Sequence, residues 1–497
     1  MEFVDVIVVG LYMLGLAAIF IYTLGQSHLA YHYLKGRGES REPKVDWSKR
    51  SPDECPMVTV QLPIFNEKYV VNRLIDAVAD FDWPKERFEI QVLDDSTDET
   101  VDIIAEKVQQ LQSENINIKH IRRDSREGYK AGALQHGLER AKGEFTAIFD
   151  ADFVPDPDFL KQTIPHFEDE EVGLVQTRWD HLNRDYSLLT RMQAFALNAH
   201  FTVEQKGRNS AGFFMNFNGT AGVWRNSCIK DAGGWHHDTL TEDLDLSYRA
   251  QLKDWDFKYL EKVTSPSELP VTVSALKSQQ YRWMKGAAET ARKHFTNIWN
   301  SRLPFITKLQ ASSHLMSSSI FVCILLISVI SVPLLLISAS TGGISTVLKT
   351  LSFFLSGILL WIFIYSLPLL TEEGKTSRKI GRFILMFPVF LSISMALSAH
   401  NSIAVFKGFL GKSSAFIRTP KFNITGLSDS WKSNEYLSND ISFSTVAEGL
   451  LALYFLLGVV AAFLIGDKAM LVFHLMLSAG FGILVGYSFY ERWAKAV

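Results

Sequence analysis

Cysteine is scarce in this chain of 497 residues, which contains Cys55, Cys228 and Cys323 and no others. An odd number of cysteines without a CxxC pair argues against a disulfide scaffold and a cysteine-ligated zinc site, and it suits a reducing compartment. Net charge is also small, with a formal value of -3 at pH 7. Proteins that bind nucleic acid through phosphate contacts carry excess positive charge, so we expect no nucleic-acid partner.

Several nucleotide-binding and catalytic motifs are missing as well. No GxGxxG or GxxxxGK[ST] turn follows the first predicted strand, which argues against a Rossmann dinucleotide site and a P-loop. No HExxH or GxSxG sequence is present, so neither a zinc protease nor a serine hydrolase of those types is indicated. The remaining features are a length too great for one compact core and a 47% hydrophobic content that is unevenly distributed.

Long uncharged runs lie at both ends of the chain, and the first covers residues 6–24. It is long enough to cross a hydrocarbon core of about 30 Å at about 1.5 Å per residue. A signal peptide, the alternative, would have basic residues before the run, whereas Glu2 and Asp5 precede it here and basic residues follow it. We therefore predict a retained anchor at residues 1–27 with its N-terminus outside, followed by a cytoplasmic linker at residues 28–55.

Uncharged runs toward the C-terminus predict four further membrane spans, near residues 315–337, 351–370, 449–466 and 469–490. The stretch 383–406 is also apolar but carries scattered serines, His400 and Asn401. If it crossed the membrane, the basic residues of the following loop and of the C-terminal tail would lie outside, against the positive-inside rule. We therefore expect five crossings and one interfacial or re-entrant helix, with residues 301–497 forming the C-terminal membrane region.

The soluble middle of the chain alternates short apolar runs with helical patterns, which predicts a parallel α/β sheet. The runs occupy residues 57–65, 88–95, 116–123 and 145–152. Ligands of such sheets bind at the carboxyl ends of the strands. Acidic pairs stand at two of these ends, with Asp94 and Asp95 after the second run and Asp150 and Asp152 after the fourth.

The acidic pairs have both a functional and an ordinary interpretation. Two carboxylates at the spacing of Asp150 and Asp152 suit Mg²⁺ or Mn²⁺, although aspartates in a turn are common without a metal. Asp94 and Asp95 precede Ser96 and Asp98, which could instead cap the next helix. Both readings can hold together. Lys130, beside two glycines at a helix start, suits a diphosphate, but it could equally be a solvated surface lysine.

Three further segments combine polar residues in patterns that allow two readings. Glu242, Asp243 and Asp245 open an amphipathic helix, where acids ordinarily complement the helix dipole, although one of them could act as a general base. Residues 218–222 form a small-residue turn that either admits a ligand close to the backbone or is an ordinary loop tip. Residues 274–290 read as a basic amphipathic helix lying against lipid.

Taken in order, six of these segments resemble the inverting family 2 glycosyltransferases, membrane enzymes related to cellulose, chitin and hyaluronan synthases. The segments are LDDS (93–96), YKAGAL (129–134), DAD (150–152), FNGTAG (217–222), TED (241–243) and QQYRW (279–283). The chain is most similar to the cellulose-synthase-like A group, the (gluco)mannan synthases, and to its C sister group. The resemblance implies an α/β nucleotide-diphospho-sugar transferase domain of GT-A type over residues 56–300, joined to an all-α transmembrane region with interfacial helices.

The resemblance also implies a role for individual residues. Asp243 would be the catalytic base that deprotonates the acceptor hydroxyl, and Trp283 and Glu242 would bind the acceptor. The donor nucleotide-sugar would be bound by Asp94, Asp95, Lys130, Asp150, Gln279 and Arg282. Asp150 and Asp152 would hold Mg²⁺ or Mn²⁺. The segment AFIRTPKF (415–422) resembles the cytosolic gating loop FxVTxK of cellulose synthase, with Arg418 in place of the valine.

These inferences predict a metal-dependent, inverting hexosyltransferase embedded in a cell, inner or Golgi-type membrane, with its catalytic domain in the cytoplasm. It would transfer sugar from UDP-glucose or GDP-mannose to a growing β-linked polysaccharide. The alternative is a non-processive enzyme that makes a glycolipid on a diacylglycerol or ceramide acceptor. A catalytically silent scaffold is a third hypothesis, but such a protein would be expected to lack some of Asp150, Asp152, Asp243 and Arg282, and all are present.

Overall fold

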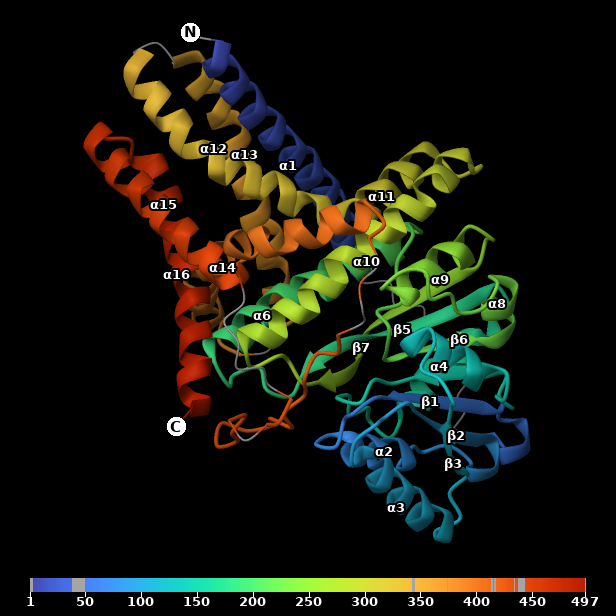
Figure 1. The fold of residues 1–497 in the computed structure, drawn as a ribbon. Helices are drawn as coiled ribbons and strands as arrows, with labels where there is room; N and C mark the ends of the chain where they lie inside the picture. Colours follow the sequence, from blue (N-terminus) through green and yellow to red (C-terminus); the bar gives the residue numbers. More distant parts are fainter. Residues whose placement is uncertain are drawn as a thin grey trace.

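The computed structural model describes residues 3–37, 50–341, 345–372, 374–412, 414, 417–432, 434–436 and 443–496. Figure 1 shows two parts, a domain built on one β-sheet and a bundle of long helices that comes from both ends of the chain. The helix α10 lies between the two parts and contacts both.

Seven strands form one mixed sheet in the described residues, in the order β3-β2-β1-β4-β6-β5-β7. Their bounds are β1 Val58–Ile64, β2 Phe88–Asp94, β3 Ile118–Arg122, β4 Phe145–Ile148, β5 Val172–His181, β6 Gly222–Arg225 and β7 Asp256–Ser267. The first four strands pair in parallel, as the sequence predicts, whereas β6 runs antiparallel to both β4 and β5. The carboxyl ends of β1, β2 and β4 therefore meet at one edge of the sheet.

Helices cover both faces of the sheet, which explains why the strands are continuous apolar runs rather than alternating ones. Val60 and Val92 belong to a core on one face, and Leu93 and Ile148 belong to a second core on the other. The helices of this domain are α2 Val71–Ala79, α3 Thr100–Ser113, α4 Tyr129–Leu138, α5 Phe159–Thr163, α6 Leu188–Ala199, the π-helix η5 His200–Gln205, α7 Lys206–Ala211, α8 Asn226–Asp231, α9 Glu242–Gln251 and α10 Val273–Asn300, with short 3₁₀ turns η2 Pro52–Glu54, η3 Lys85–Arg87 and η4 Ile164–Glu168.

Among the described residues, five helices are long and apolar enough to cross a membrane, in the ranges 3–36, 317–339, 376–409, 444–465 and 468–495. A shorter apolar helix covers residues 356–370. The elements of the bundle are α1 Phe3–Gly36, α11 Phe305–Leu315, η6 Ser317–Ser319, α12 Ile320–Thr341, α13 Ser345–Ser366, η7 Leu367–Leu370, α14 Thr376–Phe409, α15 Phe443–Ile465 and α16 Lys468–Ala496.

The first helix is longer than the sequence predicts. We expected the anchor to end at residue 27, but α1 continues to Gly36 because Ala30 and Tyr33 are buried against Val203 of the π-helix. The backbone also comes close there, since a Cβ on Gly207 would lie 2.5 Å from the carbonyl oxygen of Leu29. The first part of the predicted linker is therefore helix, and residues 38–49 of that linker lie outside the described residues.

Helix α14, which contains the predicted interfacial stretch 383–406, contacts the sheet domain near both of its ends. Just before the helix begins, the Glu372 carboxylate forms an ion pair with the Arg184 guanidinium, at 3.3 Å between Oε1 and Nη2. Near its end, a Cβ on Gly408 would lie 2.6 Å from the carbonyl oxygen of Lys285 in α10. Figure 1 shows α14 lying across the direction of α1 and α12. By length and composition α14 could span a membrane, so its interfacial position stays a prediction, one that this arrangement favours.

Candidate active site

A pocket at the carboxyl edge of the sheet brings together most of the site residues that the sequence indicates. Five elements supply them: the end of β2, the turn after β4, the first turn of α4, the first turn of α9 and the α10 helix. These residues are Asp95, Lys130, Asp150, Asp152, Glu242, Asp243, Gln279, Arg282 and Trp283. The sheet topology explains the convergence, because residues that follow neighbouring parallel strands meet at the same edge.

Lys130 connects the turn after β4 with the small-residue turn at residues 218–222. Its ammonium lies 2.5 Å from Asp150 Oδ1 and donates a hydrogen bond of 2.8 Å to the carbonyl oxygen of Gly219. Burial opposes the charge of Lys130, but the carboxylates of Asp150, Glu242 and Asp243 keep its pKa above the usual value. Lys130 is therefore a fixed positive charge in the pocket and not a solvated surface lysine. A positive charge at this place is compatible with the predicted binding of a diphosphate.

The carboxylates of Asp150 and Asp152 have the donor set that Mg²⁺ or Mn²⁺ requires. Lys130 pairs with Asp150 Oδ1, and Lys421 Nζ lies 2.6 Å from Asp152 Oδ2. Among the described residues, Asp150 Oδ2 and Asp152 Oδ1 accept no hydrogen bond, and both side chains line the pocket. Mg²⁺ and Mn²⁺ prefer oxygen ligands, and these two carboxylate oxygen atoms have no hydrogen-bond partner among the described residues. The Asp150/Asp152 pair is therefore a candidate metal site.

Glu242 and Asp243 lie side by side at the start of α9, where the helix N-terminus faces the pocket. Burial, reinforced by the neighbouring Glu242 charge, raises the pKa of Asp243 to about 7, and burial also raises the pKa of Glu242. Two adjacent acids of this kind titrate as a coupled pair. A carboxylate whose pKa is near neutrality is well suited to accept a proton.

Helix α10 carries Gln279, Arg282 and Trp283 into the pocket, and contacts with distant segments fix its position. Thr272 caps its N-terminus, and Glu491 at the end of α16 accepts hydrogen bonds from the first backbone N–H groups of the helix. Lys277 Nζ pairs with Glu448 of α15 at 2.6 Å, and both side chains are buried. The orientation of this helix therefore depends on the membrane helices.

One predicted donor-binding residue is not in the pocket. Asp94 is 1% exposed, and its carboxylate accepts hydrogen bonds of 2.8 Å from the Ser96 backbone N–H and from His120. Burial opposes its charge, but these hydrogen bonds hold its pKa below the usual value. The structure therefore does not bring the Asp94 side chain to the pocket, because that side chain supports the turn after β2, and its role in donor binding stays a prediction. Asp95 does line the pocket and forms a two-point contact with Arg123 at 3.0 and 2.5 Å.

The segment 417–422 lies over the pocket and contributes residues that sequence patterns alone do not assign to it. Thr419 Oγ1 accepts a hydrogen bond of 2.8 Å from Arg282, and Arg418 pairs with Glu67 at 2.6 Å. Glu268 holds the end of the segment by accepting backbone N–H bonds from residues 422 and 423. Residues 415 and 416 of the predicted gating loop lie outside the described residues. In the sequence, only the resemblance to FxVTxK indicated that Thr419 and Lys421 could contribute to the pocket.

Glu67 and Arg126 also line the pocket, and neither was singled out in the sequence. Glu67 follows β1, and burial raises its pKa to about 7 although Arg418 opposes the shift. The guanidinium of Arg126 lies 3.3 Å from the centroid of the Phe65 ring. A guanidinium over an aromatic ring is held there by cation–π attraction. Neither residue belongs to a motif that would have indicated its place in the pocket.

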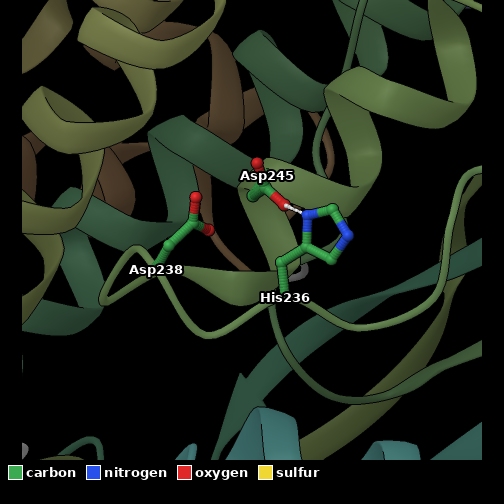
Figure 2. Close-up of side chains that lie close together, drawn as sticks. All are labelled: His236, Asp238 and Asp245. Carbon is green, nitrogen blue, oxygen red and sulfur yellow. Dashed lines mark ion pairs between the residues drawn. The ribbon is translucent and has the colours of Figure 1, made fainter.

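A second acidic cluster in the described residues has close ligand atoms but is already neutralised. His236, Asp238 and Asp245 lie together outside the pocket (Figure 2), and the dashed ion pair joins only His236 and Asp245. Lys293 Nζ lies 2.8 Å from both carboxylates, and Arg249 and His294 each contact Asp245 at 2.8 Å. These contacts hold the pKa of Asp245 well below its usual range. We interpret the cluster as an ion-pair network that anchors α9 to α10.

The sheet domain is similar to known glycosyltransferases. Residues 56–286 match the family described as "Glycosyltransferase like family 2". The chain is 44% identical over 292 residues to a probable glucomannan 4-β-mannosyltransferase of Oryza sativa subsp. japonica, covering 58% of this chain and 53% of that protein. It is 47% identical over 262 residues to glucomannan 4-β-mannosyltransferase 2 of Arabidopsis thaliana, covering 52% and 49%. The chain thus spans about half the length of the curated relatives it matches.

The fold also has a counterpart among solved structures. The mannosyltransferase PcManGT from Pyrobaculum calidifontis, in complex with GDP-Man and Mn²⁺, superposes with a TM-score of 0.55 at 18% identity. The match covers 82% of this chain and all of that one. At this level of identity the likeness concerns the fold, and it confirms the predicted GT-A-like sheet domain joined to helices apolar enough to span a membrane.

Proposed function

We propose that this chain, whose residues 56–286 match the family described as "Glycosyltransferase like family 2", transfers a hexose from a nucleotide-sugar to a β-linked glycan. The observation that carries the proposal is the pocket in which Lys130, Arg282, the Asp150/Asp152 pair and the acid pair of α9 converge. Lys130 and Arg282 can neutralise the negative charge of a diphosphate, and a carboxylate of the acid pair can accept the proton of an acceptor hydroxyl. Mannose is the favoured sugar and GDP-mannose the favoured donor, because the relatives named above are glucomannan mannosyltransferases.

In the proposed reaction, Asp243 removes the proton of the acceptor hydroxyl, whose oxygen then attacks the anomeric carbon of the donor sugar. The attack comes from the face opposite the nucleotide diphosphate, so an α-linked donor yields a β-glycoside. Lys130 and Arg282 stabilise the negative charge that develops on the departing diphosphate. Trp283 offers a flat apolar face on which the acceptor sugar can stack, and holding both reactants in place contributes much of the rate enhancement.

Asp150 and Asp152 would hold Mg²⁺ or Mn²⁺ through the two oxygen atoms that accept no hydrogen bond among the described residues. Such an ion, when bound, supplies further positive charge next to the diphosphate. Lys421 already occupies the other oxygen of Asp152. Segment 417–422, which supplies Lys421, is therefore suited to respond when a metal and a donor bind.

The arrangement of the chain supports a catalytic domain on the cytoplasmic side. Lys421 and Arg418 of the loop between α14 and α15 contact the pocket, so this basic loop lies on the same side as the catalytic domain. Glu491 at the end of α16 contacts α10 on that side as well. The positive-inside rule places such basic loops in the cytoplasm. The five crossings then belong to α1, α12, α13, α15 and α16.

A donor screen tests the proposal. Membranes that contain the chain are incubated with radiolabelled GDP-mannose, UDP-glucose or UDP-N-acetylglucosamine, each with Mg²⁺ or Mn²⁺. We expect label from GDP-mannose in ethanol-insoluble material that a β-mannanase releases, and no incorporation with Asp243→Asn. Asp238→Asn is the matched control, since Asp238 lies on the preceding loop outside the pocket. Equal incorporation by Asp243→Asn and the unmodified chain would contradict the proposal, and label confined to the organic phase would instead indicate a glycolipid product.

A further inference from the structure

A second cavity, of about 530 Å³, adjoins the acceptor end of the pocket. Leu197, Gln279 and Trp283 line both spaces, so the two are continuous at the indole ring. We call this second cavity the membrane chamber. Its walls come from α6, η5 and α10 of the sheet domain and from α1, α12, α13, α14 and α16 of the bundle.

The membrane chamber is lined mainly by hydrocarbon and aromatic side chains, such as Leu16, Ile324 and Phe390. Several of its polar side chains already bond to their own walls. Thr23 donates to the Ile19 carbonyl oxygen, Gln193 donates to the carbonyl oxygens of residues 189 and 270, and Ser328 donates to that of residue 324. His200 pairs with Glu204 at 3.2 Å. These groups leave few hydrogen-bonding sites for a polar ligand.

Polar groups without such bonds lie where the membrane chamber meets the pocket. Among the described residues, the side chains of Gln279 and Gln280 form no hydrogen bond, and Gln279 lies one helical turn from Trp283 on α10. The lining thus changes along its length, from amide groups beside the indole ring to hydrocarbon between the bundle helices. This gradient matches a ligand with a sugar at one end and a hydrocarbon chain at the other.

The physical chemistry distinguishes a glycan from a hydrocarbon occupant. Every buried sugar hydroxyl that finds no partner carries a large desolvation cost, and each hexose of a β-glycan brings several. Each methylene group moved from water into an apolar cavity is instead stabilised. Because so many of the chamber's polar groups are bonded to its own walls, a hydrocarbon chain fits this space better than a run of hexoses.

We infer that the membrane chamber binds the hydrocarbon part of an amphipathic acceptor, so that the first transfers are made onto a lipid-linked sugar whose sugar ring stacks on Trp283. The inference rests on the proposed function, since it names the acceptor class of the same site. In this inference the chamber serves the first transfers of glycan synthesis. The lipid chain of the acceptor lies between the bundle helices, and the sugar hydroxyl that reacts points to Asp243.

Alkyl glycosides of graded chain length test this inference. The purified chain in nanodiscs receives donor together with methyl, butyl, hexyl or octyl β-mannoside, or with a free β-mannotriose, all below micelle-forming concentrations. We expect kcat/KM to rise with alkyl length, by on the order of tenfold from hexyl to octyl, as burial of two methylene groups predicts. The KM for the donor stays constant across this series, because the alkyl chain lies outside the donor pocket.

Two variants that fill the chamber separate its effect from partitioning into lipid. Ala196→Trp on α6 and Ser394→Trp on α14 each add a large side chain to the lining of the chamber. Both should remove the dependence on alkyl length while they retain transfer to mannotriose. Leu359→Trp is the control, because Leu359 lies on α13 outside the chamber and is 65% exposed on the outer surface of the bundle. It should retain the full dependence on alkyl length.

The outcomes keep the inference and the proposed function apart. If mannotriose accepts sugar but kcat/KM does not change with alkyl length, the inference is wrong and the proposed function stands. If the two tryptophan variants instead abolish transfer to mannotriose but keep the dependence on alkyl length, the chamber binds glycan and the inference is again wrong. If no acceptor of either kind receives sugar from any donor, the proposed function itself fails.

Discussion

The Lys421 ammonium lies 2.6 Å from the Asp152 carboxylate, although 269 residues separate the two in the chain. Asp152 follows a central strand of the sheet, and Lys421 comes from the loop between two helices of the bundle. This contact places a basic loop directly on one of the two aspartates that suit a metal ion. It joins the helical bundle to the candidate active site, and it leads to the first prediction.

Removal of the Lys421 charge should strengthen the binding of Mn²⁺ in the absence of donor. The ammonium and the ion compete for the same buried carboxylate, so Lys421→Gln should lower the Kd by about tenfold, which corresponds to about 1.4 kcal/mol. Electron paramagnetic resonance of free Mn²⁺ measures this directly. Lys432→Gln, an exposed lysine in the same loop region, should bind Mn²⁺ like the unmodified chain. An unchanged or higher Kd in Lys421→Gln would show that the pair does not compete with the ion.

The pH dependence of kcat/KM should show an acid limb near neutrality. In the proposed reaction Asp243 acts as a base, which requires the ionised carboxylate, and its pKa is raised to about 7, so activity should increase as the pH rises through that value. The Glu242 charge contributes to this shift after burial. Glu242→Gln should therefore lower the pKa of Asp243 and move the acid limb to lower pH. Initial rates between pH 5 and 9 measure both curves, and a limb that stays in place in Glu242→Gln contradicts the assignment.

A methyl group at Gly219 should reduce turnover. Gly219 has a φ of +80°, and a Cβ there would lie 3.0 Å from Asp243 Oδ2 and 3.5 Å from Lys130 Nζ. Displacement of these two groups by a fraction of an ångström to about 1 Å should lower kcat in Gly219→Ala by up to about 100-fold. Gly212→Ala is the matched control, because Gly212 has a φ of +65° but open space around it. It should lose stability by about 1 kcal/mol and keep its kcat; equal losses of kcat in both variants would point to backbone strain alone.

The buried pair of Lys277 and Glu448 should contribute to stability in a way that depends on both partners. Their side chains are 8% and 1% exposed, so Lys277→Met leaves an uncompensated buried carboxylate and should destabilise the fold by about 3–5 kcal/mol. Combining it with Glu448→Leu should restore most of the loss. Thermal unfolding in detergent measures the series.

The exposed pair of Lys253 and Asp231 provides the comparison for that series. Its side chains are 50% and 47% exposed, so Lys253→Met should change stability by no more than about 1 kcal/mol. If the double variant of the buried pair were as unstable as Lys277→Met alone, packing rather than charge would account for the loss.

The sequence by itself determined the parts of the site that depend on local pattern. Strand runs ending in acids predicted that Asp95, Asp150 and Asp152 would meet at one edge, and they do, because neighbouring parallel strands end together. Ordered motifs indicated Lys130, Asp243, Arg282 and Trp283, all of which line the pocket. The apolar runs likewise predicted long helices at both ends, since helix length in a bilayer follows from the thickness of the hydrocarbon core.

Only the tertiary structure decided which side chain of a motif faces the pocket and which distant segments complete it. Asp94 and Asp95 are neighbours in sequence, yet one supports a turn and the other lines the pocket, because successive side chains near a strand end point to opposite sides. The contacts of Arg418 and Lys421, the extension of α1 to Gly36 and the continuity of the pocket with the membrane chamber all arise from long-range packing. Local periodicity carries no information about such contacts, since they depend on how whole elements pack together.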